Sequence, residues 1–266
     1  MSAQNHRQTF DQAVIHFHGG GFCCQDSSAH QNYTRKWALE LRVPVFSVDY
    51  RLAPKNPYPD PVNDCYQAYV WIVTQAKKQL GLDISKFILA GDSAGGHLAL
   101  SVTYLAMLRG FRAPDGLFCH YPVFMIDPLK FYPSVLLCLD EELLNQGFLQ
   151  FALACFTRKG GNPDKSCLMS PLYAPDAMLR RLPPTKFMVA EVDCLRDHSF
   201  ALAIRILKLG GTCQVILMKD FIHGFMSMDT NIVGIEEYRR GTNLTIEHFV
   251  KLFNQIKWMR EQNPSP

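Results

Sequence analysis

The sequence contains one serine in a setting typical of a nucleophile, within the run GDSAG at residues 91–95. This run follows an apolar strand pattern at residues 87–90 and precedes an Ala- and Leu-rich helical pattern at residues 95–109. A sharp strand-to-helix turn lifts the serine oxygen out of a sheet, and flanking glycines let the chains approach without Cβ clashes. The N-terminus of the following helix offers N–H groups and a favourable dipole to an oxyanion. The context predicts Ser93 as a nucleophile in acyl transfer, supported by Asp92, rather than an incidental serine in a glycine-rich turn.

A second glycine-rich segment, HGGGF at residues 18–22, follows the strand pattern AVIHF at residues 13–17. Acyl transfer needs N–H donors directed at the carbonyl oxygen, and glycines allow the backbone to turn those groups inward. We expect donors at Gly20, Gly21 and Ala94. Gly19 is expected to shape the turn and His18 to hold the loop through a hydrogen bond. A phosphate-binding loop is disfavoured because no Lys-Ser or Lys-Thr pair follows the glycines.

A serine nucleophile needs a base, which is expected later in the chain. The histidines after Ser93 are His97, His120, His198, His223 and His248. His223 is favoured because it lies in DFIHGF at residues 220–225, after the last strand pattern, where a loop with an adjacent glycine can present the ring. The other four fall in helical or strand patterns, where packing roles are expected.

The base in turn needs an acidic residue to orient it. Glu191, Asp193 and Asp197 follow a strand pattern at residues 186–190, at the strand end where active sites of open α/β sheets lie. Asp193 is favoured, because Asp197 is expected to cap the N-terminus of a helix starting at His198. Spacing alone leaves Asp197 as an alternative.

Strand-length apolar runs alternate with longer helical patterns along the chain. Strands are predicted at residues 13–17, 43–48, 87–90, 116–121, 186–190 and 213–217, and helices at residues 30–41, 61–80, 95–109, 198–209 and 242–258. This alternation predicts an α/β fold with a mostly parallel sheet covered by helices on both faces. Residues 1–266 are expected to form a single domain. Within it, a small cap-like region at about 124–176 includes a helix at 141–156, and the tail EQNPSP is expected to be disordered.

The composition argues against several classes of function. Of 266 residues, 48% are hydrophobic, so a large core can form, and a net charge of +3 without a dense basic stripe disfavours nucleic-acid binding. The nine cysteines lack zinc-type spacing, so we expect reduced thiols, a cytoplasmic location, and no metal or other cofactor. No apolar run reaches 18 residues, so no transmembrane segment is expected. Contact with a lipid surface and the oligomeric state are left open.

Together the motifs resemble the hormone-sensitive lipase family of esterases and lipases, in particular its animal branch. HGGGF at 18–22, DYRLAP at 49–54, GDSAGG at 91–96, DCLRD at 193–197 and HGF at 223–225 match family motifs, and MSPLYAPDAMLRRLPP at 169–184 matches the animal branch. The resemblance implies an α/β-hydrolase fold with Ser93, Asp193 and His223 as the catalytic triad. It also implies hydrolysis of apolar lipid esters, such as diacylglycerols, other acylglycerols and steryl esters, in lipid catabolism at a lipid-droplet surface.

Three features depart from the family pattern. Cys194 stands where the family has a proline that stiffens the turn, so Asp193 is expected to be held less firmly. His97 stands where asparagine is common. The segment before residue 13 is too short for the two strands that precede the oxyanion loop in the family, so we expect a truncated sheet with an exposed edge.

Three alternative functions follow from these observations. One is a short-chain carboxylesterase of the arylacetamide deacetylase type, and another is a truncated chain with little activity. The third is a non-catalytic binding protein on the same fold, because fold does not fix function. The presence of Ser93, Asp193 and His223 together argues against this third alternative.

Overall fold

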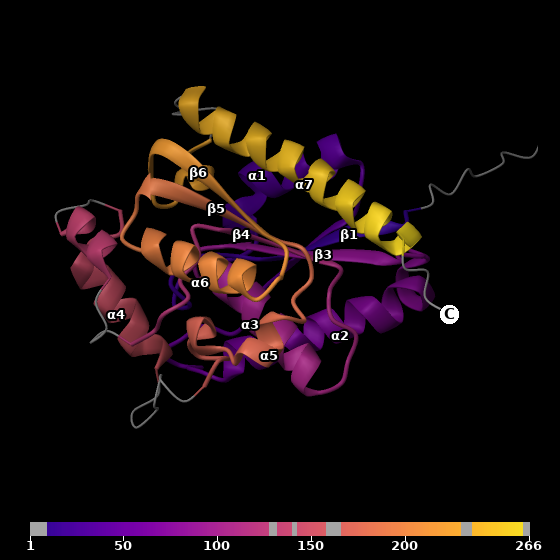
Figure 1. Ribbon diagram of the computed structural model, residues 1–266, viewed down its shortest axis with the longest axis horizontal. Helices are drawn as coiled ribbons and strands as arrows, with labels where there is room; N and C mark the ends of the chain where they lie inside the picture. The colour runs from indigo at the N-terminus through magenta and orange to yellow at the C-terminus, as the bar shows by residue number, and fades with distance from the viewer. Residues whose placement is uncertain (1–9, 128–131, 140–142, 158–165, 230–235, 263–266) are drawn as a thin grey trace, which may run out of the picture.

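The structure, a computed structural model, describes residues 10–127, 132–139, 143–157, 166–229 and 236–262 (Figure 1). Within these ranges one sheet contains six strands, β1 (Gln12–Phe17), β2 (Val45–Val48), β3 (Lys86–Asp92), β4 (Gly116–His120), β5 (Thr185–Val192) and β6 (Cys213–Ile222). Their order is β2-β1-β3-β4-β5-β6, and every neighbouring pair is parallel. The predicted parallel sheet is confirmed, and the carboxyl ends of its strands lie at one edge.

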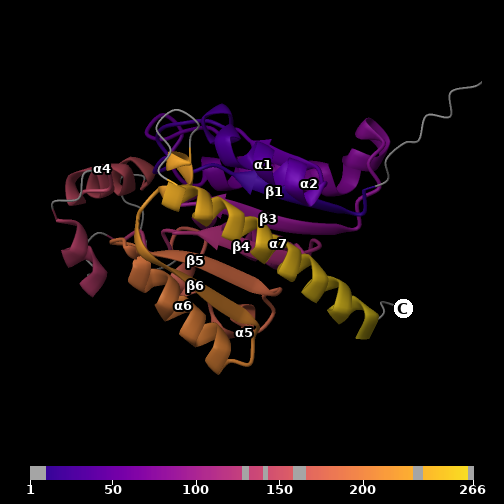
Figure 2. The same cartoon turned by 90° about the horizontal axis from the view of Figure 1, so that it is seen from above.

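Helices cover both faces of the sheet (Figures 1 and 2). One face carries α1 (Gln31–Leu41) and α7 (Glu236–Gln262), and the other carries α2 (Asp60–Leu80), α3 (Ala94–Leu108) and α6 (Arg196–Lys208). Successive side chains of a strand point to opposite faces. Strand β3 therefore contributes Leu89 to the core under α3 and Ile88 to the core under α1 and α7. The predicted covering of both faces is confirmed.

Helix α3 is buried on all sides, since every residue from Ala94 to Met107 is buried. Its sequence has no polar face, as expected for a helix that packs between the sheet and α2. A helix enclosed in this way is rigid, so it gives a fixed support to Ser93, which immediately precedes it.

A smaller group of elements stands beside the carboxyl edge of the sheet. It includes the 3-10 segment η2 (Pro133–Cys138) and α4 (Gln146–Phe156), and α4 lies apart from the layered body in both views (Figures 1 and 2). The 3-10 turn η4 (Pro171–Tyr173) and the short α5 (Asp176–Leu179) then lead back to β5. Helix α4 begins later than the expected residue 141, because the Asn145 side chain accepts the N–H of Phe148 at 2.9 Å and caps the first turn. Residues 140–142 lie outside the described residues.

Other boundaries also differ from the expectations, among them those of β2, α6 and α7. Strand β2 is an edge strand with all four residues half-buried, so the expected strand from residue 43 is shorter and less buried than predicted. Helix α6 begins at Arg196 with Leu195 in the N-cap position, so the expected cap at Asp197 is wrong. Helix α7 continues through Gln262, so the expected disorder of the tail is wrong for its first two residues, and 263–266 lie outside the described residues.

We expect Gly95→Ala to destabilise the fold. An ideal Cβ at Gly95 would lie 1.9 Å from the carbonyl oxygen of Phe17, so α3 and β1 would have to separate. Overpacking a tight core costs about 1–3 kcal/mol. Urea unfolding should show a loss of at least this size in the free energy of unfolding.

Gly147→Ala is the matched control for this substitution. The nearest atom to a Cβ there is Oδ1 of Asn145 at 3.4 Å, and alanine favours the helix. The free energy of unfolding should stay within about 0.5 kcal/mol of the unsubstituted protein. Equal losses in both variants would contradict the importance of the contact between Gly95 and Phe17.

Candidate active site

Ser93 lies in the turn between β3 and α3, at the carboxyl edge of the sheet. Its backbone has φ 53° and ψ −117°, an uncommon conformation for a residue with a side chain, and its N–H donates to the carbonyl of His120 at 2.9 Å. The turn closes tightly, because an ideal Cβ at Gly91 would lie 2.4 Å from the backbone of Gly95. The strand–turn–helix context predicted around Ser93 is present.

The ends of β5 and β6 bring two further side chains to Ser93. Asp193 directly follows β5 and His223 directly follows β6, and these two strands are paired. Nε2 of His223 lies 3.0 Å from Oγ of Ser93, and Nδ1 lies 2.9 Å from Oδ2 of Asp193. Because a carboxylate only accepts hydrogen bonds, Nδ1 carries the proton and Nε2 can accept from the serine hydroxyl. The three side chains form one hydrogen-bonded chain.

The Asp193 side chain is fully buried, and both of its oxygens have hydrogen-bond donors. Oδ2 faces His223, and Oδ1 accepts the N–H of Leu195 at 2.8 Å. Ser134 in η2 adds support to the same turn, because its Oγ donates to the carbonyl of Cys194 at 2.7 Å. Cys194 therefore sits in a turn that side-chain hydrogen bonds hold in place of the family's proline.

The two other candidate acids face away from His223. The Glu191 carboxylate accepts the backbone N–H of Asp220 at 2.9 Å. The Asp197 carboxylate accepts the backbone N–H of Ser134 at 2.9 Å, which is the contact it makes instead of the expected helix cap. The geometry therefore brings Asp193, and neither alternative, to the histidine.

The loop after β1 lies against the same site. Gly20 and Gly21 have φ of +105° and +60°, and a Cβ at these positions would meet Cys24 O at 2.1 Å and Ala152 Cβ at 2.9 Å. Only glycine fits such a backbone without strain. The carbonyl of Gly20 accepts the N–H groups of Cys23 and Cys24, at 3.1 and 3.0 Å, which fixes a tight turn. Within the described residues, the N–H groups of Gly20, Gly21 and Ala94 have no hydrogen-bond acceptor.

Aromatic rings hold this loop on both sides. Nδ1 of His18 lies 2.7 Å from the carbonyl of Gly19, and its ring stacks on Tyr50 with centroids 4.3 Å apart. The Tyr50 hydroxyl also donates to the carbonyl of His18 at 2.7 Å. Farther along the loop, Phe22 stacks on Phe156 of α4 with centroids 3.9 Å apart. The hydrogen bond expected of His18 is thus present, and Phe22 connects the loop to α4.

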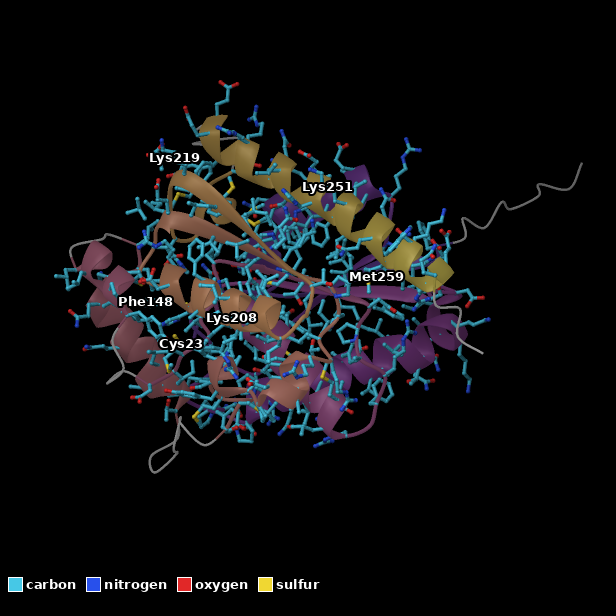
Figure 3. The ribbon with its side chains drawn as sticks, in the orientation of Figure 1. Cys23, Phe148, Lys208, Lys219, Lys251 and Met259 are labelled. Carbon is cyan, nitrogen blue, oxygen red and sulfur yellow. The ribbon has the colours of Figure 1, made fainter. Side chains whose placement is uncertain are left out.

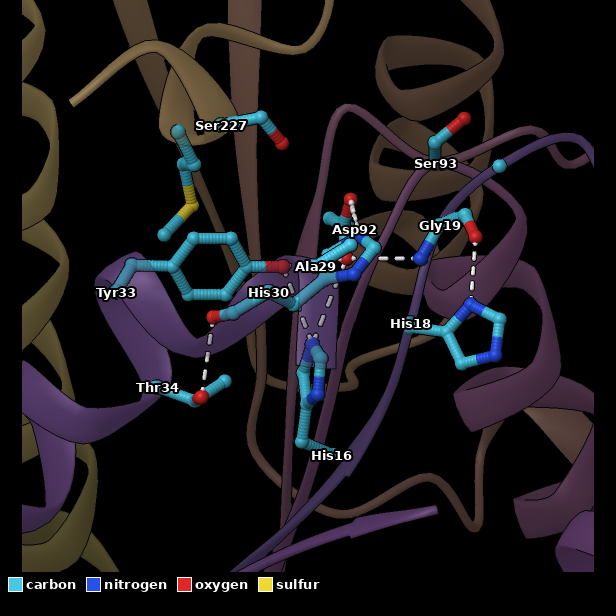
Figure 4. Close-up of polar contacts among 12 residues, drawn as sticks. His16, His18, Gly19, Ala29, His30, Tyr33, Thr34, Asp92, Ser93 and Ser227 are labelled. Atoms are coloured by element: carbon cyan, nitrogen blue, oxygen red, sulfur yellow. Dashed lines mark hydrogen bonds and ion pairs between the residues drawn. The ribbon is translucent and has the colours of Figure 1, made fainter. Parts of the chain in front are cut away.

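A buried carboxylate, Asp92, lies directly behind the nucleophile (Figure 4). Its Oδ1 accepts the N–H of Gly19 at 3.1 Å and the hydroxyl of Tyr33 at 2.7 Å. His16 and His30 lie 3.4 and 3.5 Å from its two oxygens. Burial favours the neutral acid, but the positive charge of His30 and the contact with His16 outweigh it and hold the pKa of Asp92 well below its usual value.

Sequence reasoning missed the residues around Asp92. Tyr33 is 59 positions away along the chain, and His16 occupies an ordinary inward position of a strand. Only the pairing of β1 with β3 and the packing of α1 bring these side chains together. The signal that could have found them is the unusual number of histidines, three within fifteen residues around HGGGF.

A cavity of about 290 Å³ opens at Ser93 and His223. Its remaining wall is mainly apolar, and includes Gly20, Gly21, Val123, Leu144, Leu195, Phe148, Leu149, Ala152 and Leu153. Phe148 of α4 lies beside Gly21 of the loop. Figure 3 labels Phe148 and the loop residue Cys23 in the same part of the view. The site thus combines a polar reacting centre with an apolar pocket, an arrangement typical of small-molecule sites.

The other histidines after Ser93 are buried elsewhere. Burial lowers the pKa of His97 and His120 to about 3 and that of His198 and His248 to about 4. The His97 ring packs edge-on against Phe22 and Phe156, and its Nε2 lies 3.3 Å from the carbonyl of Leu168. These histidines remain neutral at ordinary pH and serve packing, as expected.

Within the described ranges, no group of three or more His, Cys, Asp or Glu side chains is arranged to hold a metal ion. No helix in the same part of the chain combines the length and the apolar character needed to cross a membrane.

Known proteins are similar to this chain in sequence and in fold. The family described as alpha/beta hydrolase fold matches residues 14–227. Hormone-sensitive lipase of Homo sapiens is 39% identical over 159 residues, which is 58% of this chain and 15% of that protein. Carboxylesterase NlhH of Mycobacterium tuberculosis is 32% identical over 216 residues, which is 80% of this chain and 66% of that protein. The matched part thus spans less than a quarter of the hormone-sensitive lipases it resembles.

Solved esterase structures agree with this match. Carboxyl esterase 2 of Tuber melanosporum superposes with a TM-score of 0.83 and 28% identity, covering 92% of this chain and 78% of that chain. The esterase of Pyrobaculum calidifontis gives a TM-score of 0.82 and 28% identity, covering 94% of this chain and 78% of that chain. The parallel sheet and its helices are those of an α/β-hydrolase fold.

We expect His97→Asn to make the stability of the protein less sensitive to acid. The unfolded chain protonates His97 near pH 6.5, whereas the folded protein resists protonation down to about 3, so stability is lost as the pH falls below 6.5. Between pH 7 and pH 5 this amounts to about 2 kcal/mol. Urea unfolding at the two pH values should show that the variant loses this much less stability.

Ser101→Ala provides the control, since Ser101 lies one helical turn farther along α3 and does not titrate. It should keep the pH dependence of the unsubstituted protein. If the stability of His97→Asn keeps the pH dependence of the unsubstituted protein, His97 is protonated in the folded state and its ring is not shielded from water.

Proposed function

Since the chain belongs to the alpha/beta hydrolase fold family, in the group that contains hormone-sensitive lipases and carboxylesterases, we propose that it is a carboxylic ester hydrolase. Ser93 is the nucleophile, His223 the general base and Asp193 the acid that orients it. The observation that carries the proposal is the hydrogen-bonded chain of 3.0 and 2.9 Å that ends at Ser93 Oγ, at the floor of an apolar cavity.

The reaction proceeds by two acyl transfers. His223 Nε2 takes the proton of Ser93 as its Oγ attacks the ester carbonyl, and the resulting imidazolium is stabilised by the buried Asp193 carboxylate. The imidazolium then protonates the departing alcohol and leaves an acyl group on Ser93. A water molecule, activated by His223 in the same way, releases the carboxylic acid and restores the serine. None of these steps requires a metal or another cofactor.

The developing oxyanion is stabilised by the N–H groups of Gly20, Gly21 and Ala94. Support for this role comes from the positive φ values of the two glycines and from the absence of other acceptors for these donors among the described residues. The N–H of Ala94 has further support, because Ala94 lies at the N-terminus of α3, where the helix dipole favours negative charge.

We further propose that the substrates are apolar lipid esters, such as diacylglycerols, other acylglycerols and steryl esters. The apolar pocket supports this assignment, as do two exposed apolar side chains that line it, Leu143 and Phe148. Phe151, on α4 like Phe148, is also exposed. Exposed apolar side chains of this kind suit contact with a lipid surface, such as a lipid droplet. A cytoplasmic location is consistent with the eight described cysteines, all of which are free thiols.

A short-chain carboxylesterase is the second candidate. It is favoured by the size of the cavity, since about 290 Å³ is close to the lower limit for small-molecule sites. Sequence similarity also supports this second candidate. The match to the carboxylesterase of Mycobacterium tuberculosis covers 80% of this chain, whereas the match to hormone-sensitive lipase covers 58% of it.

We expect a fluorophosphonate probe to label the protein and Ser93→Ala to abolish the labelling. Removing the nucleophile of a triad lowers kcat by at least about 10⁴-fold, which p-nitrophenyl ester assays can measure. Ser101→Ala is the control, because Ser101 lies on the same helix and donates to the carbonyl of Leu168 at 3.0 Å. An unlabelled protein contradicts the proposed activity, and labelling of Ser93→Ala contradicts the assignment of the nucleophile.

We expect the protein to act faster on emulsified diacylglycerols and long-chain p-nitrophenyl esters than on p-nitrophenyl acetate. Phe151→Ser should lower the rate on the emulsion but not on the soluble acetate, because Phe151 is 58% exposed on α4 beside the pocket. The matched control is Trp258→Ser, since Trp258 is 61% exposed on the distant end of α7. A strong preference for acetate identifies the short-chain esterase instead.

A further inference from the structure

Three imidazoles surround the Asp92 carboxylate behind the nucleophile. His16 belongs to β1, His18 begins the glycine-rich loop, and His30 ends the 3-10 turn η1 (Ser28–His30). The ring of His30 lies 5.8 Å from that of His16 and 5.5 Å from that of His18, and each of the three side chains is at most 1% exposed. The reaction proposed above uses none of them directly.

His30 has an oxygen that can only accept beside each ring nitrogen. Its Nδ1 lies 2.8 Å from the backbone carbonyl of Asp26, within hydrogen-bonding distance. Its buried Nε2 lies 3.5 Å from Oδ2 of Asp92, which is an ion-pair distance without a hydrogen bond. A neutral ring would turn an unprotonated nitrogen toward one of the two oxygens, so both neighbours favour the imidazolium. Burial lowers the pKa of His30, but the charge of Asp92 and the two contacts outweigh it and raise the pKa above its ordinary value.

The other two imidazoles have different surroundings. His16 has a hydroxyl donor at one nitrogen only, because its Nδ1 lies 2.8 Å from Ser47 Oγ and can accept from it. The proton of a neutral ring then lies on Nε2, which is 3.3 Å from the Tyr33 hydroxyl oxygen and 3.4 Å from Oδ1 of Asp92. Burial lowers the pKa of both His16 and His18, so these rings are neutral. The positive charge of His30 therefore balances the negative charge of the buried Asp92 carboxylate.

Asp92 links this ion pair to the oxyanion loop. Its Oδ1 accepts the N–H of Gly19, the residue before the two proposed donors, and its own backbone continues into Ser93. Figure 4 shows the carboxylate between the rings and the loop. An ideal Cβ at Gly19 would lie 2.4 Å from Oδ2, so the loop and the carboxylate are in close contact.

We propose that His30 is a positioning residue for ester hydrolysis: its imidazolium holds the Asp92 carboxylate, which through Gly19 fixes the oxyanion loop against Ser93. This inference rests on the proposed function and adds a residue to it. His30 does not touch the substrate. It acts on the transition state, because the loop donors must lie within hydrogen-bonding distance of the oxyanion when charge develops.

The inference gives the reaction an alkaline limit. His30 must be charged, so activity falls toward alkali as this ring loses its proton above pH 6.5. The groups facing His30 are the Asp92 and Asp26 carboxylates, whose pKa values are both lowered, the neutral His16 and His18, and the Tyr33 hydroxyl, whose pKa burial raises well above its ordinary value. None of these facing groups titrates near neutral pH.

His30→Gln tests the role of the charge. We expect kcat for a soluble p-nitrophenyl ester to fall roughly 10- to 100-fold with little change in KM, because the loss affects transition-state contacts. The alkaline fall in kcat should disappear. His248→Gln is the control, since His248 lies on α7 beside Lys186 and away from the site, and it should keep the alkaline fall. A His30→Gln variant with the unsubstituted kcat and alkaline limb overturns the inference.

A measurement that does not depend on activity completes the test. The ¹³C resonance of the His30 ring, assigned by its absence from His30→Gln or, if that variant does not fold, from His30→Asn, should titrate above pH 6.5. Its titration should move to lower pH in Asp92→Asn, which removes the anion. A resonance that titrates below pH 6.5 in the unsubstituted protein overturns the inference.

The two proposals can fail separately. If the fluorophosphonate probe labels Ser93 but His30→Gln leaves kcat and the pH profile unchanged, the inference on His30 is wrong and the ester hydrolase stands. If the probe does not label the protein, the proposed function fails, whatever the titration of His30.

Discussion

The close approach of β1 to the first turn of α3 is the constraint on which the site depends. Gly95 lies against the carbonyl of Phe17 with no room for a side chain, and β1 pairs with β3 so that Phe17 stands opposite Gly91. The loops that follow these two strands therefore leave the sheet side by side, one carrying the proposed oxyanion donors and the other the proposed nucleophile. The pairing of β5 with β6 does the same for Asp193 and His223. The relative positions of these residues therefore depend on the register of the sheet.

The local signals in the sequence were sufficient for the parts of the site that depend on short segments. Each of these parts can be recognised from neighbouring residues in the sequence. They are the glycines around Ser93, the triple glycine after β1, and the acidic and histidine residues at two strand ends. The strands and helices followed from the alternation of apolar patterns, which a doubly covered parallel sheet makes strong. Boundaries set by side-chain caps were less accessible, as at Asn145, whose capping bond depends on which residue actually begins α4.

Features that depend on distant parts of the chain could not be predicted. The polar cluster behind Ser93 joins residues of β1, η1, α1 and β3, and no spacing rule relates them. The half-buried state of β2 follows from its place at the end of the strand order, which its own four residues do not reveal. The pKa values of the histidines also depend on their surroundings in the fold. The pKa of His30 is raised and that of His97 is lowered because the two rings have different neighbours.

The stack between Phe22 and Phe156 joins two parts of the molecule that both line the pocket, the glycine-rich loop and α4. Phe22 follows the glycines of the oxyanion loop, and Phe156 is the last residue of α4, which also touches Gly21 through Ala152. A displacement of α4 that widened the pocket would break this stack and withdraw the support of the loop. Access for a bulky molecule and stabilisation of negative charge are therefore mechanically coupled, and a wider opening carries a cost in reactivity.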